Sequence, residues 1–193
     1  MDEDEFEFDE AAQHDPAWSD WSDPERIGRQ IDKLFTETLA SVPREPWWDT
    51  DRVVRGTDNT VPAMPDCGRY DQQMVQYIEQ VLDYFLPDES AVYDVPANRD
   101  TADRFVCYFG ELFVQRVEGI WFNLLSNRDP LYPDFGPSVC FEYTPKTESA
   151  TQLLLMAIED GVSAELYDYG IEYADHKGLP HDIHGDRQRF LSS

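Results

Sequence analysis

Three histidines near the C-terminus come closest to a catalytic or metal-binding pattern. The segment "DHKGLPHDIHGD" contains His176, His181 and His184, interleaved with Asp175, Asp182 and Asp186. Imidazole and carboxylate groups are good ligands for zinc and other divalent transition metals, so a small metal-dependent hydrolase is one function that this segment permits. The spacing matches no specific metal motif, however, and a polar C-terminal tail explains the same residues without any chemistry. We therefore expect no bound metal and no cofactor.

A single carboxylate, Glu111 in "FGELFVQRVEGIW", is the second candidate. A carboxyl group beside apolar residues can have a raised pKa and act as an acid or a base. No second carboxylate accompanies it at a recognisable spacing. A contact with Gln115 or Arg104 on the same helix is the simpler expectation.

Other chemical motifs are missing from the sequence. It contains no phosphate-binding glycine loop, nucleophile elbow or zinc-protease helix. Cys67, Cys107 and Cys140 form no C-x-x-C pair, which argues against a disulfide framework or a zinc knuckle. Cys107 and Cys140 are expected to be small buried hydrophobic residues. We predict no catalytic residue and no enzymatic activity.

Residues 104–143 carry a loose motif made of Gly110-Glu111 and of Gly119 with Trp121, followed by "PSVCFEY". This stretch resembles small bacterial domains that have a helix with Gly-Glu, a turn with Gly and Trp, and then a hairpin. Some of those domains look like immunity partners of secreted toxins. A second glycine often seen beside the position of Gly119 is replaced here by Glu118. The resemblance implies a role of the toxin-immunity type and carries over no catalytic residue.

The chain is strongly acidic, with 40 Asp and Glu against 15 Lys and Arg and a net charge of −25. Residues 1–23 hold ten acidic residues and no Lys or Arg, and the rest of the chain is also acidic, with 30 acidic against 15 basic residues. Such a field repels nucleic acids and anionic lipids and speeds the approach of cationic proteins. We predict a basic protein partner and no binding to nucleic acid or membranes.

The charge also has an explanation that involves no partner. Asp outnumbers Glu by 24 to 16 and Arg outnumbers Lys by 12 to 3, a composition typical of salt-loving archaea or of bacteria with GC-rich genomes. A structural or regulatory subunit whose acidity is an adaptation to salt is therefore a third alternative.

Six aromatic residues stand in or near the acidic and irregular segments of the N-terminal half. They are Phe6, Phe8, Trp18, Trp21, Trp47 and Trp48. Large aromatic side chains supply much of the contact energy in protein interfaces, so we predict these six as partner-binding residues of an immunity or inhibitor protein. Packing against the folded body is the alternative for Trp18 and Trp21 and for the loop residues Trp47 and Trp48.

Hydrophobic spacing predicts the elements that must position these residues. Apolar stripes at helical period predict helices near 24–42, 69–86, 99–117 and 147–160, followed by a short fifth helix. Residues 119–125 and 138–143 are predicted as two antiparallel strands. We therefore expect an α+β fold: a mostly helical single domain with four to five helices and a small antiparallel hairpin or sheet.

The expected organisation has three parts. Residues 1–22 are predicted to be a flexible acidic segment, residues 23–175 a globular domain, and residues 176–193 a polar tail. No apolar run is long enough to cross a bilayer, and the N-terminus is acidic where a signal peptide would be basic. A cytoplasmic location is expected.

Overall fold

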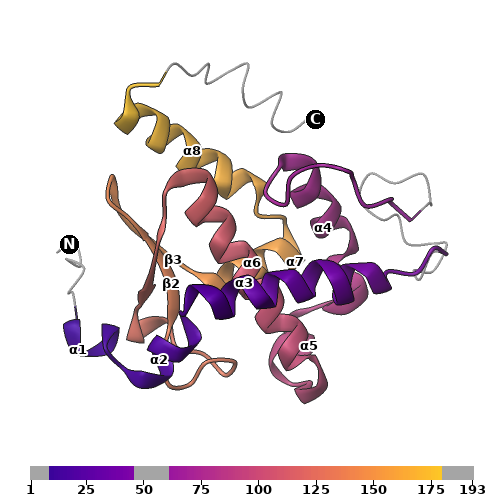
Figure 1. The fold of residues 1–193 in the computed structure, drawn as a ribbon, viewed down its shortest axis with the longest axis horizontal. Helices are drawn as coiled ribbons and strands as arrows, with labels where there is room; N and C mark the ends of the chain where they lie inside the picture. The colour runs from indigo at the N-terminus through magenta and orange to yellow at the C-terminus, as the bar shows by residue number, and fades with distance from the viewer. Residues whose placement is uncertain (1–8, 46–60, 180–193) are drawn as a thin grey trace.

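The computed structural model describes residues 9–45 and 61–179, which form eight α-helices and a three-stranded antiparallel sheet (Figure 1). The helices are α1 (Glu10–Gln13), α2 (Pro16–Trp21), α3 (Pro24–Lys33), α4 (Gln72–Phe85), α5 (Glu89–Tyr93), α6 (Arg99–Val117), α7 (Ala150–Glu159) and α8 (Ser163–Lys177). The strands are β1 (Ile120–Asn123), β2 (Pro137–Phe141) and β3 (Thr144–Ser149). The predicted α+β class is confirmed. The structure has more helices than the four to five predicted, because the short helices α1, α2 and α5 were not expected.

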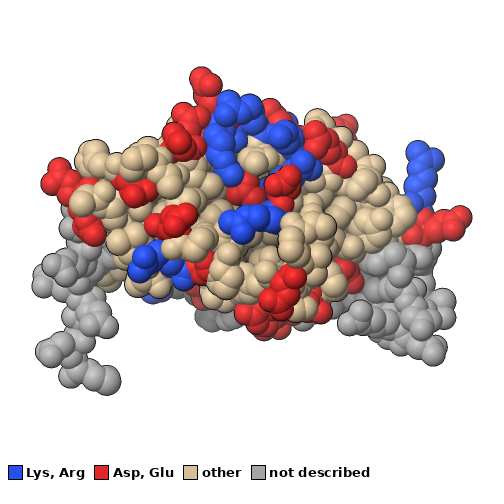
Figure 2. Space-filling view, turned by 90° about the horizontal axis from the view of Figure 1, so that it is seen from below, with Lys and Arg blue, Asp and Glu red and all other residues tan. Residues whose placement is uncertain are grey.

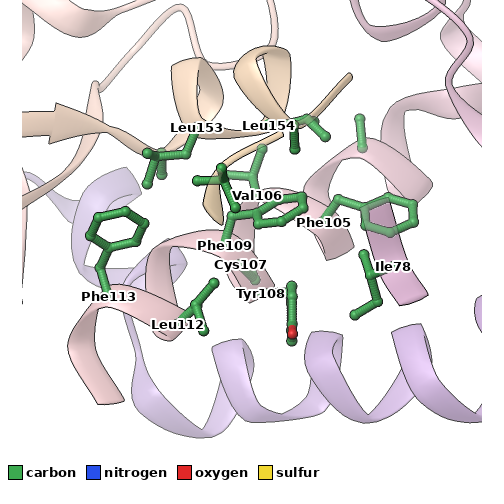
Figure 3. Packing of buried hydrophobic residues seen from close by; sticks show 14 of the residues in the cluster. Ile78, Phe105, Val106, Cys107, Tyr108, Phe109, Leu112, Phe113, Leu153 and Leu154 are labelled. Atoms are coloured by element: carbon green, nitrogen blue, oxygen red, sulfur yellow. The ribbon is translucent and has the colours of Figure 1, made fainter. Parts of the chain in front are cut away.

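Helix α6 is the centre of the fold. Helices α3, α5, α7 and α8 and strands β1 and β2 all contact it. Its aromatic residues Phe105, Phe109 and Phe113 are completely buried, and Figure 3 shows Leu153 and Leu154 of α7 above them. The long predicted helix at 99–117 is confirmed with the same bounds.

The sheet has the order β1-β2-β3, and both pairs of strands are antiparallel. Ile120 lies opposite Cys140, and the register of β2 against β3 shifts between Cys140 and Phe141. Strand β3 was not predicted. Its sequence "TPKTES" has no alternation of apolar and polar residues, and the predicted helix at 147–160 included its last three residues.

Aspartate residues begin several helices. The side chains of Asp9, Asp15, Asp23 and Asp88 accept hydrogen bonds from backbone N–H groups in the first turns of α1, α2, α3 and α5. A carboxylate at this position satisfies free amide groups and interacts favourably with the helix dipole. The role of these residues as helix caps thus explains part of the excess of Asp over Glu, independently of partner binding or adaptation to salt.

The N-terminal segment differs from its prediction. Residues 9–22 of the predicted flexible segment include α1 and α2, and they are tied to the sheet. Gln13 Nε2 donates to the carbonyl of Asn123 at 2.8 Å, and Asn123 Nδ2 donates to the carbonyl of Ala12 at 2.8 Å. These bonds attach the segment to strand β1, which is otherwise an edge of the sheet. The folded body therefore begins well before residue 23.

The C-terminal boundary also shifts slightly. Helix α8 runs through His176 and ends at Lys177, and Gly178 adopts a left-handed conformation with φ of 65°. The polar tail predicted from residue 176 thus begins inside the last turn of a helix. Its residues 180–193 lie outside the described part of the chain.

Within residues 9–45 and 61–179, no helix combines the length and the apolar character needed to span a membrane.

Candidate functional site

A buried carboxylate, Asp103 of α6, joins the N-terminal helices to the core. Its Oδ1 accepts hydrogen bonds from Trp21 Nε1 at 2.9 Å and from Tyr132 Oη at 2.7 Å. Its Oδ2 accepts from Arg26 Nη2 at 2.5 Å and from Gln30 Nε2 at 2.9 Å. A buried charge is tolerated when it is paired and fully hydrogen-bonded, and four donors meet this condition.

A hollow of about 280 Å³ opens beside this carboxylate and is lined in part by Arg26, Arg99 and Tyr132. Its polar groups are largely committed to the fold: Arg26 Nη1 also donates to Cys107 Sγ at 3.1 Å, and Arg99 donates to the carbonyl of Leu131. Burial raises the pKa values of the Cys107 thiol and the Tyr132 hydroxyl. Both groups are therefore neutral at physiological pH, and the network has a structural role.

The predicted partner-binding tryptophans Trp18 and Trp21 lie in the hydrophobic core, so the prediction that they contact a partner is wrong. Their exposed fractions are 4% and 6%, and their rings stack with centroids 5.6 Å apart. Phe135 contacts both rings. The structure agrees with the alternative expectation, in which Trp18 and Trp21 pack against the folded body.

The other four predicted partner-binding residues, Phe6, Phe8, Trp47 and Trp48, lie outside the described residues. Two of the three candidate metal ligands, His181 and His184, do so as well. His176 stands at the exposed end of α8, where its ring lies 5.7 Å from that of Tyr143. The described part of the chain contains no group of three His, Cys, Asp or Glu side chains placed to hold a metal ion.

The motif Gly110-Glu111 with Trp121 is a single packed unit in the structure. Trp121 of β1 covers Gly110 of α6 so closely that a Cβ atom on Gly110 would lie 1.9 Å from the ring carbon Cη2. Trp121 Nε1 donates to Glu111 Oε2 at 3.0 Å, and Gln115 Nε2 donates to Glu111 Oε1 at 2.7 Å. The contact with Gln115 that the helical spacing allowed is therefore present. The alternative partner, Arg104, pairs with Glu37 at 2.8 Å.

Gly119, the other glycine of the motif, allows β1 to approach β2 closely. A Cβ atom there would lie 2.4 Å from a methyl group of Val139. The preceding residue, Glu118, has φ of 52° and is the one non-glycine residue with positive φ in the described part of the chain. This left-handed conformation favours glycine, so Glu118 occupies a backbone position that a glycine would adopt with less strain.

A cleft of about 390 Å³ lies beside this motif, between α3 and the second half of α6. Ile27, Gly28 and Ile31 line it from α3, and Val114 and Trp121 line it from the other side. A Cβ atom on Gly28 would meet no atom within 4 Å. The cleft therefore has mainly apolar walls, and it stays open at Gly28 because this residue has no side chain to fill it.

Three ionisable side chains and one phenol also line this cleft: Asp32, Arg69, Glu111 and Tyr70. Arg69 Nη1 pairs with Asp32 Oδ1 at 2.7 Å, and its guanidinium lies 5.0 Å from the centre of the Phe35 ring. Among the described residues, Glu111 has no ion pair. Burial, together with the nearby Glu111 carboxylate, raises the pKa of Tyr70 to about 12. The cleft thus carries one negative charge without a neutralising partner.

Helix α8 presents a row of acidic side chains. Glu165, Asp168, Glu172 and Asp175 follow each other at intervals of three and four residues, which places them on one side of the helix. Glu172 pairs with Lys146 at 2.5 Å. The face shown in Figure 2 has Lys and Arg side chains gathered near its middle, with Asp and Glu side chains around and between them. This face lies on the other side of the molecule from α8 (Figures 1 and 2).

Tyrosine rings adjoin this acidic row. Tyr143 and Tyr173 pack with their ring centres 5.7 Å apart, and both are partly exposed. Tyr173 Oη donates to Glu118 Oε1 at 2.8 Å, and Lys177 pairs with Glu118 Oε2 at 2.7 Å. Hydrogen bonds from Lys177 and Tyr173 lower the pKa of Glu118. The described surface here combines carboxylates with half-exposed aromatic rings.

Comparison with protein-family models, curated proteins and solved structures finds no match to this chain. The candidate surfaces therefore have to be interpreted from their own chemistry.

Proposed function

We propose that this protein is an acidic binding module that neutralises a basic protein partner, as an immunity protein or inhibitor does. The row of carboxylates on α8, next to the half-exposed tyrosines Tyr143 and Tyr173, is the observation that supports this proposal best. Complementary charge accelerates encounter, and partly buried aromatic rings supply contact energy once the partner is bound. The proposed place of action is the cytoplasm.

The placement of the basic residues supports a binding face. Acidic side chains lie on the face shown in Figure 2 as well as on α8, but that face also carries clustered Lys and Arg, whereas α8 has four acidic residues and one lysine, Lys177. At 0.1 M salt, the attraction between exposed charges is largely screened beyond a distance of about 10 Å. Partner capture should therefore fall steeply as salt increases.

The test is a pull-down with the full chain at low and high salt, using a double charge reversal on α8, Asp168→Lys with Asp175→Lys. Both side chains are exposed. The matched control reverses two exposed carboxylates elsewhere, Asp20→Lys with Asp94→Lys, so that the net charge changes equally. We expect a stoichiometric basic protein that the wild type and the control retain at low salt and the α8 variant loses.

Equal loss in both double variants would mean that only net charge matters, which would contradict a specific acidic face. No retained protein at either salt concentration would count against the binding function altogether.

A further inference from the structure

We infer that the cleft between α3 and α6 is a socket for an arginine side chain, with Glu111 as the group that receives the guanidinium. The inference rests on the proposed function only for the source of that arginine, a basic partner protein. The contacts that support it lie entirely within the described residues.

The first step is the fixed position of the carboxylate. Trp121 Nε1 and Gln115 Nε2 each donate to a different oxygen of Glu111, at 3.0 Å and 2.7 Å. An ionised carboxylate has about four lone-pair sites, so both oxygens keep the capacity to accept further hydrogen bonds. The two neutral donors orient Glu111 and leave its charge uncompensated.

The second step is the balance of charge within the cleft. Arg69 is the cation that lines it, and it is already held by Asp32 at 2.7 Å and by the ring of Phe35. The described lining therefore has a net charge of one negative unit, on Glu111. A cationic group fits this site, and an anionic one does not.

The third step is the choice of arginine. The guanidinium is planar and weakly hydrated, it binds a carboxylate through two parallel hydrogen bonds, and it stacks on aromatic faces. The rings of Tyr70 and Trp121 line the same cleft as Glu111. Ile27 and Ile31 offer an apolar wall for the methylene stem, and the open space at Gly28 leaves room for it.

The experiment titrates the full chain, labelled with ¹⁵N on its tryptophan indoles, with Nα-acetyl-arginine amide. The Trp121 Nε1–H resonance reports on the Glu111 carboxylate that it contacts, and a Trp121→Phe variant assigns it. The Trp18 indole, buried in the core and stacked on the Trp21 ring, is an internal reference for the fold. We expect a saturable shift of the Trp121 signal and an unmoved Trp18 signal. Nα-acetyl-citrulline amide, which has nearly the same shape without the charge, should cause no shift.

The decisive variant is Glu111→Gln, which keeps an acceptor for Trp121 and removes the charge. It should weaken arginine binding by roughly tenfold or more, because a charge-assisted pair is lost. Glu142→Gln, at an exposed carboxylate outside the cleft lining, is the matched control and should bind as the wild type does. The same titration with Nα-acetyl-lysine amide tests the guanidinium itself. A stronger response to this lysine probe than to the arginine probe would mean that the cleft attracts any cation, and would overturn the inference.

An unmoved Trp121 signal, or the same affinity in Glu111→Gln, would also overturn it. These results leave the proposed function intact if the α8 reversal still abolishes capture of a basic protein. Conversely, if the Trp121 signal responds specifically to arginine but the pull-down captures no partner, the arginine socket is supported and the proposed binding function is refuted.

Discussion

Replacing Gly110 with alanine tests whether the packed motif holds the sheet against α6. The added Cβ would lie 1.9 Å, 2.5 Å and 2.7 Å from three carbons of the Trp121 ring, so the indole must move. The ring cannot move freely, because its Nε1 is bonded to Glu111 and its edge packs on Trp21 with ring centres 5.3 Å apart. Overpacking and the loss of these contacts outweigh the better helix propensity of alanine and should lower the free energy of unfolding by about 3 kcal/mol.

Urea denaturation measures this change, and thermal unfolding should show a midpoint lower by roughly 6 to 12 °C for a chain of this size. The matched control is Gly170→Ala in α8, where a Cβ would meet no atom within 4 Å. This control should raise the stability by up to about 1 kcal/mol, because alanine is the better helix former. In a Trp121→Ala background most of the cost of Gly110→Ala should disappear. The reasoning fails if Gly110→Ala stabilises the protein as much as Gly170→Ala does. It also fails if Gly110→Ala lowers the free energy of unfolding equally in the wild type and in the Trp121→Ala background.

Three further results are expected. Asp103→Asn should lower the free energy of unfolding by about 3 kcal/mol in urea denaturation, because the half-buried Arg26 guanidinium loses the carboxylate that it pairs with; a loss near zero would show that solvent already screens the pair. Burial raises the pKa of Glu148, partly offset by the hydrogen bond from Tyr169 Oη. The folded state therefore binds this proton more tightly, and the group favours folding below its ordinary pKa of 4.5 and loses that contribution as the pH rises through the higher folded value. The difference in free energy of unfolding between Glu148→Gln and the wild type should accordingly shift in favour of the variant from about pH 4 to about pH 7, as measured by denaturation at each pH. The same difference at both pH values would contradict this. Finally, the thermal midpoint should change little between low salt and molar KCl while partner capture is lost; a steep rise of the midpoint with KCl would favour salt adaptation instead.

The parts of the fold that follow from a long hydrophobic stripe could be predicted from the sequence. Helices α4 and α6 are long enough for several turns of regular apolar spacing, and they were predicted to within a few residues. The helices α1, α2 and α5 have four to six residues, too few for such a pattern. A local signal for α2 did exist, since Asp15-Pro16 repeats the cap and first-turn proline of Asp23-Pro24.

The burial of Trp18 and Trp21 could not be derived from the same patterns. The composition around them is that of a solvated acidic tail, and the partner of Trp21 is Asp103, 82 positions further along the chain. Likewise, the sequence marked Gly110, Glu111 and Trp121 as a motif but could not place α3 opposite them. The cleft exists because a tertiary contact brings Gly28 to that motif, and local spacing contains no information on such a contact.

The attachment of α2 to the core also has a consequence for biosynthesis. Trp21 leaves the ribosome long before Asp103 and Tyr132, the two residues that complete its environment. During that interval two large indoles are exposed on an unfinished chain, a state that favours aggregation. The acidic residues that surround them, Asp15, Asp20 and Asp23 among others, keep this nascent segment hydrated and repel other copies of it. The N-terminal helices are thus among the first parts made, and their contacts with Asp103 and Tyr132 can form only after those residues have been synthesised.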